Sequence, residues 1–420
     1  MADKKILVRA IGRCRLCGNE ELAPLLDLGE QVPTGMFVKE AVPVAAGPLQ
    51  LVKCHGKAGR CDLVQLRHSY DLGELYGKNY GYRSGLNQSM VRHLKELVEK
   101  AVALAAPEPG ELVVDIGSND STLLRCYPDG LARVGIDPTS EKFKSYYPKD
   151  VVRIPDFFSS DKVSAAAKGR RAKIVTSIAM FYDLESPLAF MKEVRDVLAP
   201  DGIWVFEQSH MPTMVAKNAY DTVCHEHLEY YGLRQIHWMT ERAGLKILDV
   251  SFDDTNGGSF RVTAGRSDGP RPEARALVER LLAQEDKDGF TSLAPWEAFR
   301  ARVFKHRDEL VALVAKLEKD GKKVFGYGAS TKGNVLLQFC GLTAEDIPCV
   351  AEVNEDKFGC VTPGSRIPIV PEADARARRP DYFLVLPWHF KEGIARREKA
   401  FLKSGGKLLF PLPEIEVISA

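Results

Sequence analysis

The apolar residues of this chain follow a helical spacing in some segments and form short continuous runs in others. In residues 86–105, apolar side chains recur at helical spacing from Leu94 to Leu104, with charged side chains between them. This pattern predicts an amphipathic helix. Short apolar runs of strand length then recur at residues 112–116, 133–136, 151–154, 174–178 and 202–206. A helical segment at 188–198 separates the last two runs, and this alternation predicts a parallel sheet with helices on its faces.

The C-terminal third repeats this pattern. Residues 323–334 combine an apolar strand, a glycine-rich turn and a helix start, and further strands are expected at 349–352 and 381–386. A polar stretch with Gly and Pro at 265–272 precedes a mainly helical region at 273–320. Because 420 residues exceed what one hydrophobic core accommodates, the length predicts two to three domains. The patterns along the chain favour three, in an α/β protein. The expected boundaries are 1–85, 86–268 and 269–420, and the second and third domains are expected to be Rossmann-like.

The charge balance excludes several classes of function. Lys and Arg number 58 against 57 Asp and Glu, which disfavours a nucleic-acid binder acting through bulk charge and a basic membrane-surface protein. No apolar run reaches the ~18 residues that a membrane span requires. The first five residues, Met-Ala-Asp-Lys-Lys, lack the apolar segment of a secretory signal, so we expect a cytoplasmic protein with reduced cysteines.

Four of the nine cysteines lie within the first 61 residues, which favours a metal site. Cys14 and Cys17 form a Cys-x-x-Cys-Gly turn that directs both sulfurs to one centre, and Cys54 and Cys61 supply a second pair. Four thiolates predict a structural Zn²⁺ ion that stabilises a small domain with little core of its own. The spacing leaves open His55 in place of Cys54, a redox pair, or unrelated thiols.

The first strand–turn–helix unit carries the pattern of a nucleotide-cofactor site. Its turn, residues 115–120, contains the single glycine Gly117 and ends in Asp120, and Asp120 or Ser121 is expected to cap a following helix. Asp137, at the end of the second strand, is spaced to reach a ribose diol. A dinucleotide fingerprint requires more glycines, whereas S-adenosylmethionine (SAM) has no phosphate and carries a sulfonium and an ammonium. The negative turn therefore favours SAM.

The end of the third strand extends this candidate site. Asp156 and Phe157 are placed to contact an adenine ring by a hydrogen bond and by stacking, although core packing is the alternative role of Phe157 and Phe158. The positions that we assign to cofactor binding are Asp115, Gly117, Asn119, Asp120, Asp137, Asp156, Phe157 and Ser177.

Titratable side chains are densest just after the fifth strand of this domain. Two histidines, two glutamates, an aspartate and three tyrosines fall within residues 220–231, which predicts an active site. A zinc-protease motif is excluded because Glu229 stands where His-Glu-x-x-His requires its second histidine. Acid–base chemistry by a histidine beside Glu226 is favoured, and a His-x-His metal pair or a structural cluster are the alternatives.

Five motifs in one order carry a family resemblance. They are the cysteine turn at 14–18, the acidic turn at 115–120, His225-Glu226-His227, Asn256-Gly-Gly-Ser259 and Gly326-Tyr-Gly-Ala-Ser-Thr-Lys-Gly333. This set resembles the SAM-dependent C-methyltransferases of deoxysugar biosynthesis over nearly the whole chain. The resemblance implies a zinc domain, a SAM domain and a C-terminal Rossmann-like domain that helps to hold a nucleotide-linked keto-sugar. It also implies methylation of a carbon next to the ketone.

The resemblance also assigns roles to residues. It implies that His227 is the general base, that Glu226 is its partner, and that His225 and Tyr82 complete the catalytic set. A tyrosine hydroxyl or His225 is expected to stabilise the enolate oxygen. Cys224 stands where the family has a tyrosine, and residues 176–183 lack a histidine that relatives often carry. Substrate contacts are expected from Tyr80, Tyr230, Asn256, Gly257, Gly328, Lys332, Asn334 and Glu352.

The second glycine turn leaves another class of enzyme open. Its glycines and Lys332 suit a phosphate at a helix N-terminus, and Glu352 suits a ribose. The runner-up function is therefore an NAD(P)-dependent oxidoreductase acting on a nucleotide-sugar, and the non-enzymatic alternative is a zinc-bearing interaction protein. We expect a small-molecule nucleotide-sugar as the partner, and neither a nucleic acid nor a membrane. The turn at 256–259 either only reverses the chain or also approaches the ligand.

Overall fold

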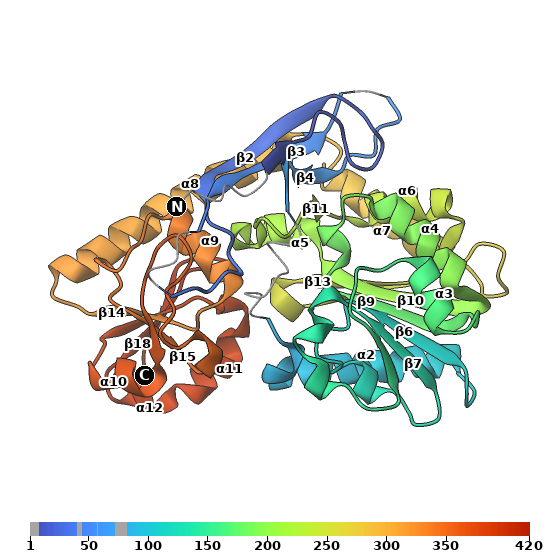
Figure 1. Cartoon of the computed structure of the whole chain (residues 1–420). Coiled ribbons are helices and arrows are strands. Elements are labelled where there is room, and N and C mark those ends of the chain that lie inside the picture. Colours follow the sequence, from blue (N-terminus) through green and yellow to red (C-terminus); the bar gives the residue numbers. More distant parts are fainter. Residues whose placement is uncertain (1–7, 40–43, 57, 72–81) are drawn as a thin grey trace.

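The computed structural model describes residues 8–39, 44–56, 58–71 and 82–420, and its largest sheet has seven strands (Figure 1). Five neighbouring strands are parallel, and the two at one edge are antiparallel. In spatial order they are β12 (Leu245–Asp253), β13 (Ser259–Arg266), β10 (Leu198–Ser209), β9 (Ala172–Ile178), β6 (Leu112–Ile116), β7 (Ala132–Ile136) and β8 (Val151–Ile154). The structure thus confirms the expected α/β alternation.

Helices cover both faces of this sheet because alternate strand residues point to opposite sides. On one face, Val113 of β6 packs with α2 (Gln88–Ala105), which matches the amphipathic helix expected at 86–105. On the other face, Val114 belongs to a cluster formed with the remaining helices of the domain. Those helices are α3 (Ser160–Ala166), α4 (Pro187–Val197), α6 (Leu233–Ala243) and α7 (Arg275–Lys287).

One sequence expectation for this domain was wrong. The helix expected after the Gly117 turn is replaced by a single 3-10 turn, Leu124–Cys126. Asn119 and Ser121 both adopt positive φ angles, 45° and 65°, and this left-handed backbone interrupts a right-handed helix before it can begin. The turn therefore presents irregular backbone, rather than a helix N-terminus, at the end of β6.

The C-terminal part forms a second open sheet of six strands. The strands are parallel except β19 at the edge, in the order β16 (Ile369–Pro371), β15 (Val350–Glu352), β14 (Val324–Tyr327), β17 (Tyr382–Val385), β18 (Lys407–Phe410) and β19 (Glu416–Ile418). Its helices are α9 (Thr331–Phe339), α10 (Glu372–Ala377), α11 (Lys391–Arg397) and α12 (Lys399–Lys403). This sheet confirms the second Rossmann-like unit.

The N-terminal residues form a smaller sheet that recruits a strand from the middle of the chain. Its order is β11 (Glu229–Tyr230), β4 (Val64–Leu66), β3 (Gly47–Cys54) and β2 (Leu22–Gln31). A separate pair joins β1 (Val8–Ala10) to β5 (His68–Tyr70). Because β11 directly follows His225-Glu226-His227, the N-terminal sheet fixes one end of that motif.

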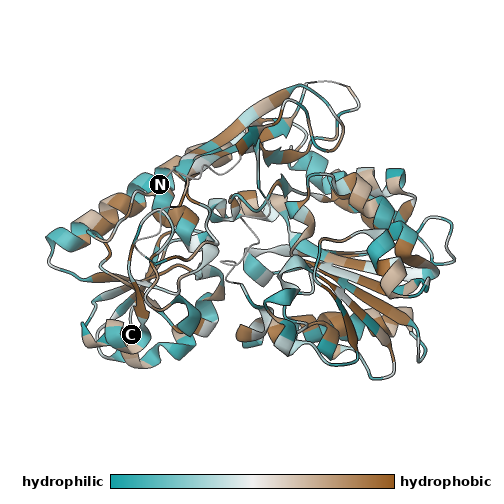
Figure 2. Ribbon diagram, viewed as in Figure 1, coloured by the Kyte–Doolittle hydropathy of each residue, from teal (hydrophilic) through white to brown (hydrophobic). Residues whose placement is uncertain are grey.

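The hydrophobic cores cross the three sequence regions. One cluster joins N-terminal residues such as Leu51 with Tyr220 of the central segment and with Phe383 of the C-terminal sheet. A second cluster joins Cys14 and Cys54 to the seven-stranded sheet. Figure 2 shows that the strands of both large sheets are mainly hydrophobic and that the outer helices carry hydrophilic residues. The N-terminal sheet is therefore packed against both large units.

Two further helices connect these parts. The long helix α8 (Ala294–Lys319) lies beside the N-terminal sheet (Figure 1), and α5 (Met211–Ala216) precedes the His-Glu-His segment. No described helix is both long and apolar enough to cross a membrane.

A buried carboxylate fixes the start of α6. Glu285 of α7 accepts hydrogen bonds from the N–H groups of Leu233 (2.5 Å) and Arg234 (3.1 Å), the first residues of that helix. A carboxylate at a helix N-terminus accepts hydrogen bonds from N–H groups that have no partner within the helix. Its negative charge also interacts favourably with the positive end of the helix dipole. Glu285 thus links α7 to α6, on which the cysteine cluster rests.

We predict that Glu285→Ala lowers the free energy of unfolding by about 2 kcal/mol, because two buried N–H groups lose a charged acceptor. Urea unfolding followed by circular dichroism measures the loss. Glu279→Ala, an exposed change on the same helix, is the control and should leave stability within about 0.5 kcal/mol of wild type. Equal stability of the two variants would contradict the capping role.

Candidate cofactor, metal and catalytic sites

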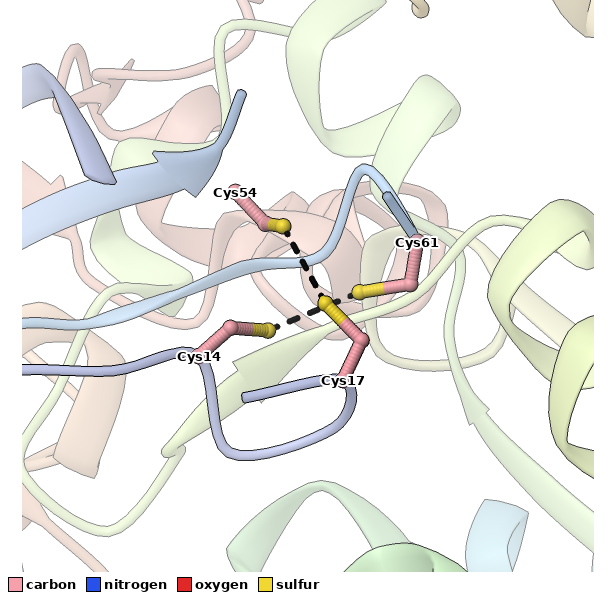
Figure 3. A group of neighbouring side chains, drawn as sticks. All are labelled: Cys14, Cys17, Cys54 and Cys61. Atoms are coloured by element: carbon pink, nitrogen blue, oxygen red, sulfur yellow. Dashed lines mark hydrogen bonds between the residues drawn. The ribbon is translucent and has the colours of Figure 1, made fainter. Parts of the chain in front are cut away.

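The four N-terminal cysteines converge on one centre (Figure 3). The Sγ atoms of Cys14 and Cys61 lie 3.5 Å apart, as do those of Cys17 and Cys54, and all four lie within 4.8 Å of one another. Zinc–thiolate bonds of ~2.3 Å imply sulfur–sulfur edges of about 3.8 Å in a tetrahedron, so the group fits Zn²⁺. His55, the alternative ligand, is not part of the group.

Neighbouring groups hold the cysteines in place. Gly18 adopts a left-handed φ of 72° and donates its N–H to Cys14 O at 2.9 Å, which closes the turn. Asn19 Nδ2 donates to Cys54 Sγ at 3.3 Å and supports the negative charge of a ligated thiolate. Cys61 O accepts from Gln235 Nε2 of α6 at 3.0 Å, which attaches the cysteine cluster to the seven-stranded domain.

A cavity of about 230 Å³ opens beyond the carboxyl ends of β6, β7 and β9, where ligands bind in open α/β sheets. Its described lining includes no Lys, Arg or His, whereas it includes five acidic residues: Asp115, Asp137, Asp183, Glu185 and Glu207. A cavity whose ionisable groups are all acidic favours a cationic ligand and disfavours a diphosphate.

Asp115 and Asp137 are buried carboxylates on the wall of this cavity. Asp115 accepts from Thr176 Oγ1 at 2.6 Å, and burial raises its pKa to about 7. Burial also raises the pKa of Asp137, whose oxygens accept from Asn119 N (2.9 Å) and from the N–H and hydroxyl of Thr139. A bound cation would stabilise the ionised form of both groups.

The turn after β6 holds a neighbouring segment over the cavity. Asn119 Oδ1 accepts from Ser84 N at 3.0 Å and Nδ2 donates to Tyr82 O at 3.3 Å, and both Tyr82 and Ser84 line the cavity. Asp120 Oδ2 accepts from Gly85 N at 3.0 Å, and Asp120 lies outside the lining. The structure therefore uses Asp120 to fix the 82–85 segment.

The end of β8 contributes an aromatic wall. Phe157 lines the cavity with 46% of its surface exposed, as expected of a ring available for stacking. Phe158 also lines it but packs on Phe190, with ring centroids 5.0 Å apart. Asp156 lies outside the lining and pairs with Lys162 Nζ at 2.6 Å. Of the two residues expected to contact adenine, only Phe157 faces the cavity.

Gly117 and Ser177 are placed differently from each other. Gly117 lines the cavity with a φ of 75°, and an added Cβ would lie 3.1 Å from Met180 Cγ, so a side chain is excluded. Ser177 is fully buried outside the lining and accepts from Trp204 Nε1 at 3.0 Å.

The backbone of its own loop orients His227. Nδ1 lies 2.8 Å from Thr222 O, which assigns the proton to Nδ1 and leaves Nε2 as the acceptor. Burial lowers the pKa of His227 to about 4, against the opposing effect of Glu226, so the imidazole is neutral near pH 7. A small cavity beside His227 is lined by Tyr182 and Tyr230. This tautomer and charge state are those of a proton acceptor.

Glu226 is held from the N-terminal region. Its carboxylate accepts from Gly35 N at 3.2 Å and from Thr34 Oγ1 at 3.4 Å, and 8% of the residue is exposed. These contacts direct it to the N-terminal segment, so its influence on His227 is electrostatic, raising the pKa of the imidazole.

His225 belongs to the core between domains. It is fully buried, Nε2 donates to Gly47 O at 3.2 Å, and its ring stands edge-on to Tyr70 with centroids 4.7 Å apart. The structure places it in neither the acidic cavity nor the small cavity beside His227. The three residues of the motif thus point to three different surroundings.

The turn at 256–259 approaches the C-terminal domain. Lys332 Nζ of α9 donates to Asn256 O at 2.6 Å, and Asn256 also lines the acidic cavity. At Gly257 an added Cβ would lie 3.2 Å from Trp388, whose Nε1 donates to Asp221 Oδ2 at 2.7 Å. Lys332 therefore stands between the acidic cavity and the loop that carries His227.

The other expected substrate residues of the C-terminal unit have structural contacts, within that unit or to the N-terminal segment. Glu352 accepts from the N–H groups of Ala329 (2.8 Å) and Asn354 (2.9 Å), and Asn334 Nδ2 donates to Thr34 O at 2.8 Å. Gly328 adopts a φ of 78°, where an added Cβ would lie 2.8 Å from Pro387. Tyr80 lies outside the described residues.

A second group with metal-like spacing contains its own cation. His93, Glu207 and Asp253 lie within reach of one centre, but Arg261 stands 2.6 Å from Glu207 and 3.5 Å from Asp253. His93 Nε2 lies 2.6 Å from the same glutamate. Because the Arg261 guanidinium already pairs with both carboxylates, we assign no metal there.

Sequence reasoning missed several residues of these sites. Glu207 follows the apolar run 202–206, so its position at a strand end was a usable signal. Thr34 and Trp388 gave no local signal, because their partners Glu226 and Asp221 lie 192 and 167 positions away along the chain.

Comparisons with known proteins agree with this geometry. Family models match three segments: a zinc binding domain at 14–76, a methyltransferase domain at 90–250, and a C-methyltransferase C-terminal domain at 254–413. C-methyltransferase NovU of Streptomyces niveus is 32% identical over 419 residues, which cover 99% of this chain and 98% of NovU.

Two solved structures each match less than half of the chain. The CcbJ methyltransferase from Streptomyces caelestis is 15% identical, with 41% of this chain and 89% of that chain covered and a TM-score of 0.33. An O-methyltransferase family protein from Burkholderia thailandensis is 18% identical, with coverages of 47% and 63% and a TM-score of 0.35.

The fold and the acidic cavity define a SAM-dependent methyltransferase. The identity shared with NovU over almost the entire chain is specific: this chain belongs to the C-methyltransferase family. Its cofactors are SAM and Zn²⁺, and the cysteine cluster supplies four thiolates suited to the metal.

We predict one zinc ion per chain, released when Cys54→Ser removes a ligand. Because the cysteines share a core with the seven-stranded sheet, metal loss should lower the thermal midpoint by several degrees. Elemental analysis and calorimetry measure both effects, with Cys360→Ser, a cysteine outside the cluster, as control. A metal-free protein of unchanged midpoint would contradict a structural ion.

We predict that Phe157→Ala weakens SAM binding about tenfold, because stacking on an aromatic ring contributes ~1–3 kcal/mol per base. Calorimetric titration measures the dissociation constant. Phe252→Ala removes a ring of similar exposure, 48%, outside the cavity and should leave binding unchanged. Equal affinities of the two variants would remove Phe157 from the cofactor site.

Proposed function

We propose that this protein transfers a methyl group from SAM to the carbon next to the ketone of a nucleotide-linked keto-deoxysugar. The observation that carries the proposal is the state of His227: a neutral imidazole whose Nε2 has no hydrogen-bond partner among the described residues and can accept a proton. A ketone makes the neighbouring C–H acidic enough for such a base. SAM supplies an electrophilic methyl group when it is bound.

The cofactor is assigned to the acidic cavity. Asp137 retains an acceptor position for a ribose hydroxyl, because a carboxylate offers about four and three are used within the protein. Asp115 and the backbone at Gly117 face the amino-acid portion, and Phe157 faces the adenine. The absence of basic side chains from the described lining suits the positive charges of SAM.

The base and the cofactor are adjacent. Tyr182 packs edge-on against the ring of His227, with centroids 4.3 Å apart, and the next residue, Asp183, lines the acidic cavity. Residues 182–183 therefore form a common wall of the two sites. A substrate carbon beside His227 Nε2 is then within reach of a group presented from the acidic cavity.

The substrate class rests on the third domain. The strand β14, the Gly328 turn and α9 form a second Rossmann-like unit. Ser330 caps the N-terminus of α9, where its Oγ accepts from Gly333 N at 3.0 Å. Such a unit suits the nucleotide portion of a substrate and places the sugar toward Lys332 and His227. The family resemblance points to the same substrate class.

The oxidoreductase alternative has weaker support. A nicotinamide dinucleotide carries a diphosphate, which the all-acidic ionisable lining of the first cavity would repel. In the second unit, Glu352 directs its carboxylate to backbone N–H groups of neighbouring turns, which uses the acceptors that a ribose requires.

We predict that His227→Asn lowers methyl transfer at least 100-fold, because an amide cannot accept the proton, while the SAM dissociation constant stays within threefold of wild type. Mass spectrometry of methylated products from a panel of dTDP-, UDP- and GDP-linked keto-deoxyhexoses measures turnover, and titration measures binding. His237→Asn, a partly exposed histidine on α6, is the control. Full turnover by His227→Asn would overturn the assignment of the base.

A further inference from the structure

The structure removes one donor that the sequence led us to expect for the enolate oxygen, while Tyr82 lines the acidic cavity and Tyr230 lines the small cavity beside His227. His225 is buried against Gly47 and Tyr70, and Cys224 replaces the tyrosine of relatives. Tyr230 remains beside His227, and its hydroxyl is also buried without a hydrogen-bond partner among the described residues. Burial raises the pKa of this hydroxyl well above the ordinary value, which makes it a weaker acid than the Lys332 ammonium. A negative oxygen formed in this site requires a better donor.

Lys332 contacts the wall of the acidic cavity through Asn256, although it belongs to the lining of neither that cavity nor the small cavity beside His227. Its Nζ donates one hydrogen bond, to Asn256 O at 2.6 Å, and an ammonium has three N–H groups. Asn256 lines the acidic cavity. The carboxylate of Asp221, whose charge acts on Lys332, lies one residue before Thr222, and Thr222 orients His227. The hydrogen bond to Asn256 holds the ammonium at this junction.

The charge of the Lys332 ammonium acts on the base and on the residues around it. The ammonium is among the groups that shift the pKa values of His227, Asp221 and His389. His389 Nδ1 is buried without a hydrogen-bond partner among the described residues, as expected of a polar atom that faces a ligand. Burial lowers the pKa of Lys332 itself and so makes its ammonium a stronger acid than an exposed lysine.

We propose that the Lys332 ammonium donates a hydrogen bond to the ketone oxygen of the substrate and stabilises the enolate, rather than contacting a phosphate. This inference rests on the proposed function. The buried carboxylate of Asp221 acts through space on the ammonium charge, and an ammonium whose charge is partly compensated suits a neutral carbonyl better than a diphosphate.

The proposed steps balance. The C–H bond next to the ketone breaks, its proton moves to His227 Nε2, and the electron pair forms the enolate whose oxygen accepts from Lys332. The carbon then forms a bond to the methyl group as the sulfonium–methyl bond breaks, which restores the ketone and yields S-adenosylhomocysteine. His227 returns its proton to water.

The test separates enolate formation from methyl transfer. With S-adenosylhomocysteine in place of SAM, exchange of the substrate proton for deuterium from solvent reports enolate formation alone. Exchange by wild type, Lys332→Met, Lys332→Arg and Tyr230→Phe is followed by mass spectrometry on the panel of dTDP-, UDP- and GDP-linked keto-deoxyhexoses. Lys357→Met is the matched control, because Lys357 Nζ also donates to a backbone carbonyl, Ala329 O at 2.7 Å.

We expect Lys332→Met to slow exchange at saturating substrate about 100-fold, with substrate affinity changed less than threefold. Lys332→Arg should restore part of the rate. The wild-type exchange rate should also fall at high pH as the ammonium loses its proton, with a midpoint below the ordinary lysine pKa. In Lys332→Arg this midpoint should move to higher pH, because a guanidinium keeps its proton. Lys357→Met should behave as wild type.

Two results would overturn the role of Lys332. Weakened binding with an unchanged exchange rate in Lys332→Met would show a phosphate contact, and loss of exchange only in Tyr230→Phe would assign the donor to the tyrosine. Failure of the wild-type enzyme to exchange or methylate any member of the panel would instead overturn the proposed function, and the role of Lys332 with it.

Discussion

The structure depends on the way one central segment, residues 220–230, is held from three sides. Strand β11 pairs with β4 of the N-terminal sheet, Trp388 of the C-terminal domain bonds to Asp221, and Thr34 and Gly35 bond to Glu226. Tyr220 adds a contact to His306 of α8, 3.1 Å away. A short loop with several buried polar groups is stabilised by hydrogen-bond partners, and here the partners of Asp221 and Glu226 come from distant parts of the chain.

This arrangement explains why a methyltransferase of this kind needs parts beyond the seven-stranded domain. The cofactor cavity is built almost entirely from that domain, at the ends of β6, β7 and β9. The loop that bears His227 is different, because its conformation is set by contacts that the seven-stranded domain does not make. The zinc cluster contributes indirectly, through the hydrogen bond of Cys61 O to Gln235 and the shared core.

Local sequence patterns predicted much of the fold and part of the site. The strands at 112–116 and 174–178, the helix beginning near residue 88 and the convergence of the cysteines follow from periodicity and spacing. The predictions that failed were those that depended on tertiary contacts. Asp120 and Glu352 sit in the expected turns, but backbone N–H groups nearby take their carboxylates, and no sequence pattern shows which of two possible partners a buried acid will bind. The irregular turn after Gly117 arises from two left-handed residues in place of an expected helix cap.

The segment that contains Thr34 has a consequence for the exchange of parts between related enzymes. It is tied to α9 by Asn334, to the helix end by Gln338, which bonds to both the N–H and the carbonyl of Val32, and to strand-like pairing between Val38 and Val361. A hybrid that takes its C-terminal half from a relative to change substrate preference would break these ties unless the N-terminal segment came from the same parent. Recombination between such enzymes should therefore favour crossovers that keep the two chain ends together and replace the middle.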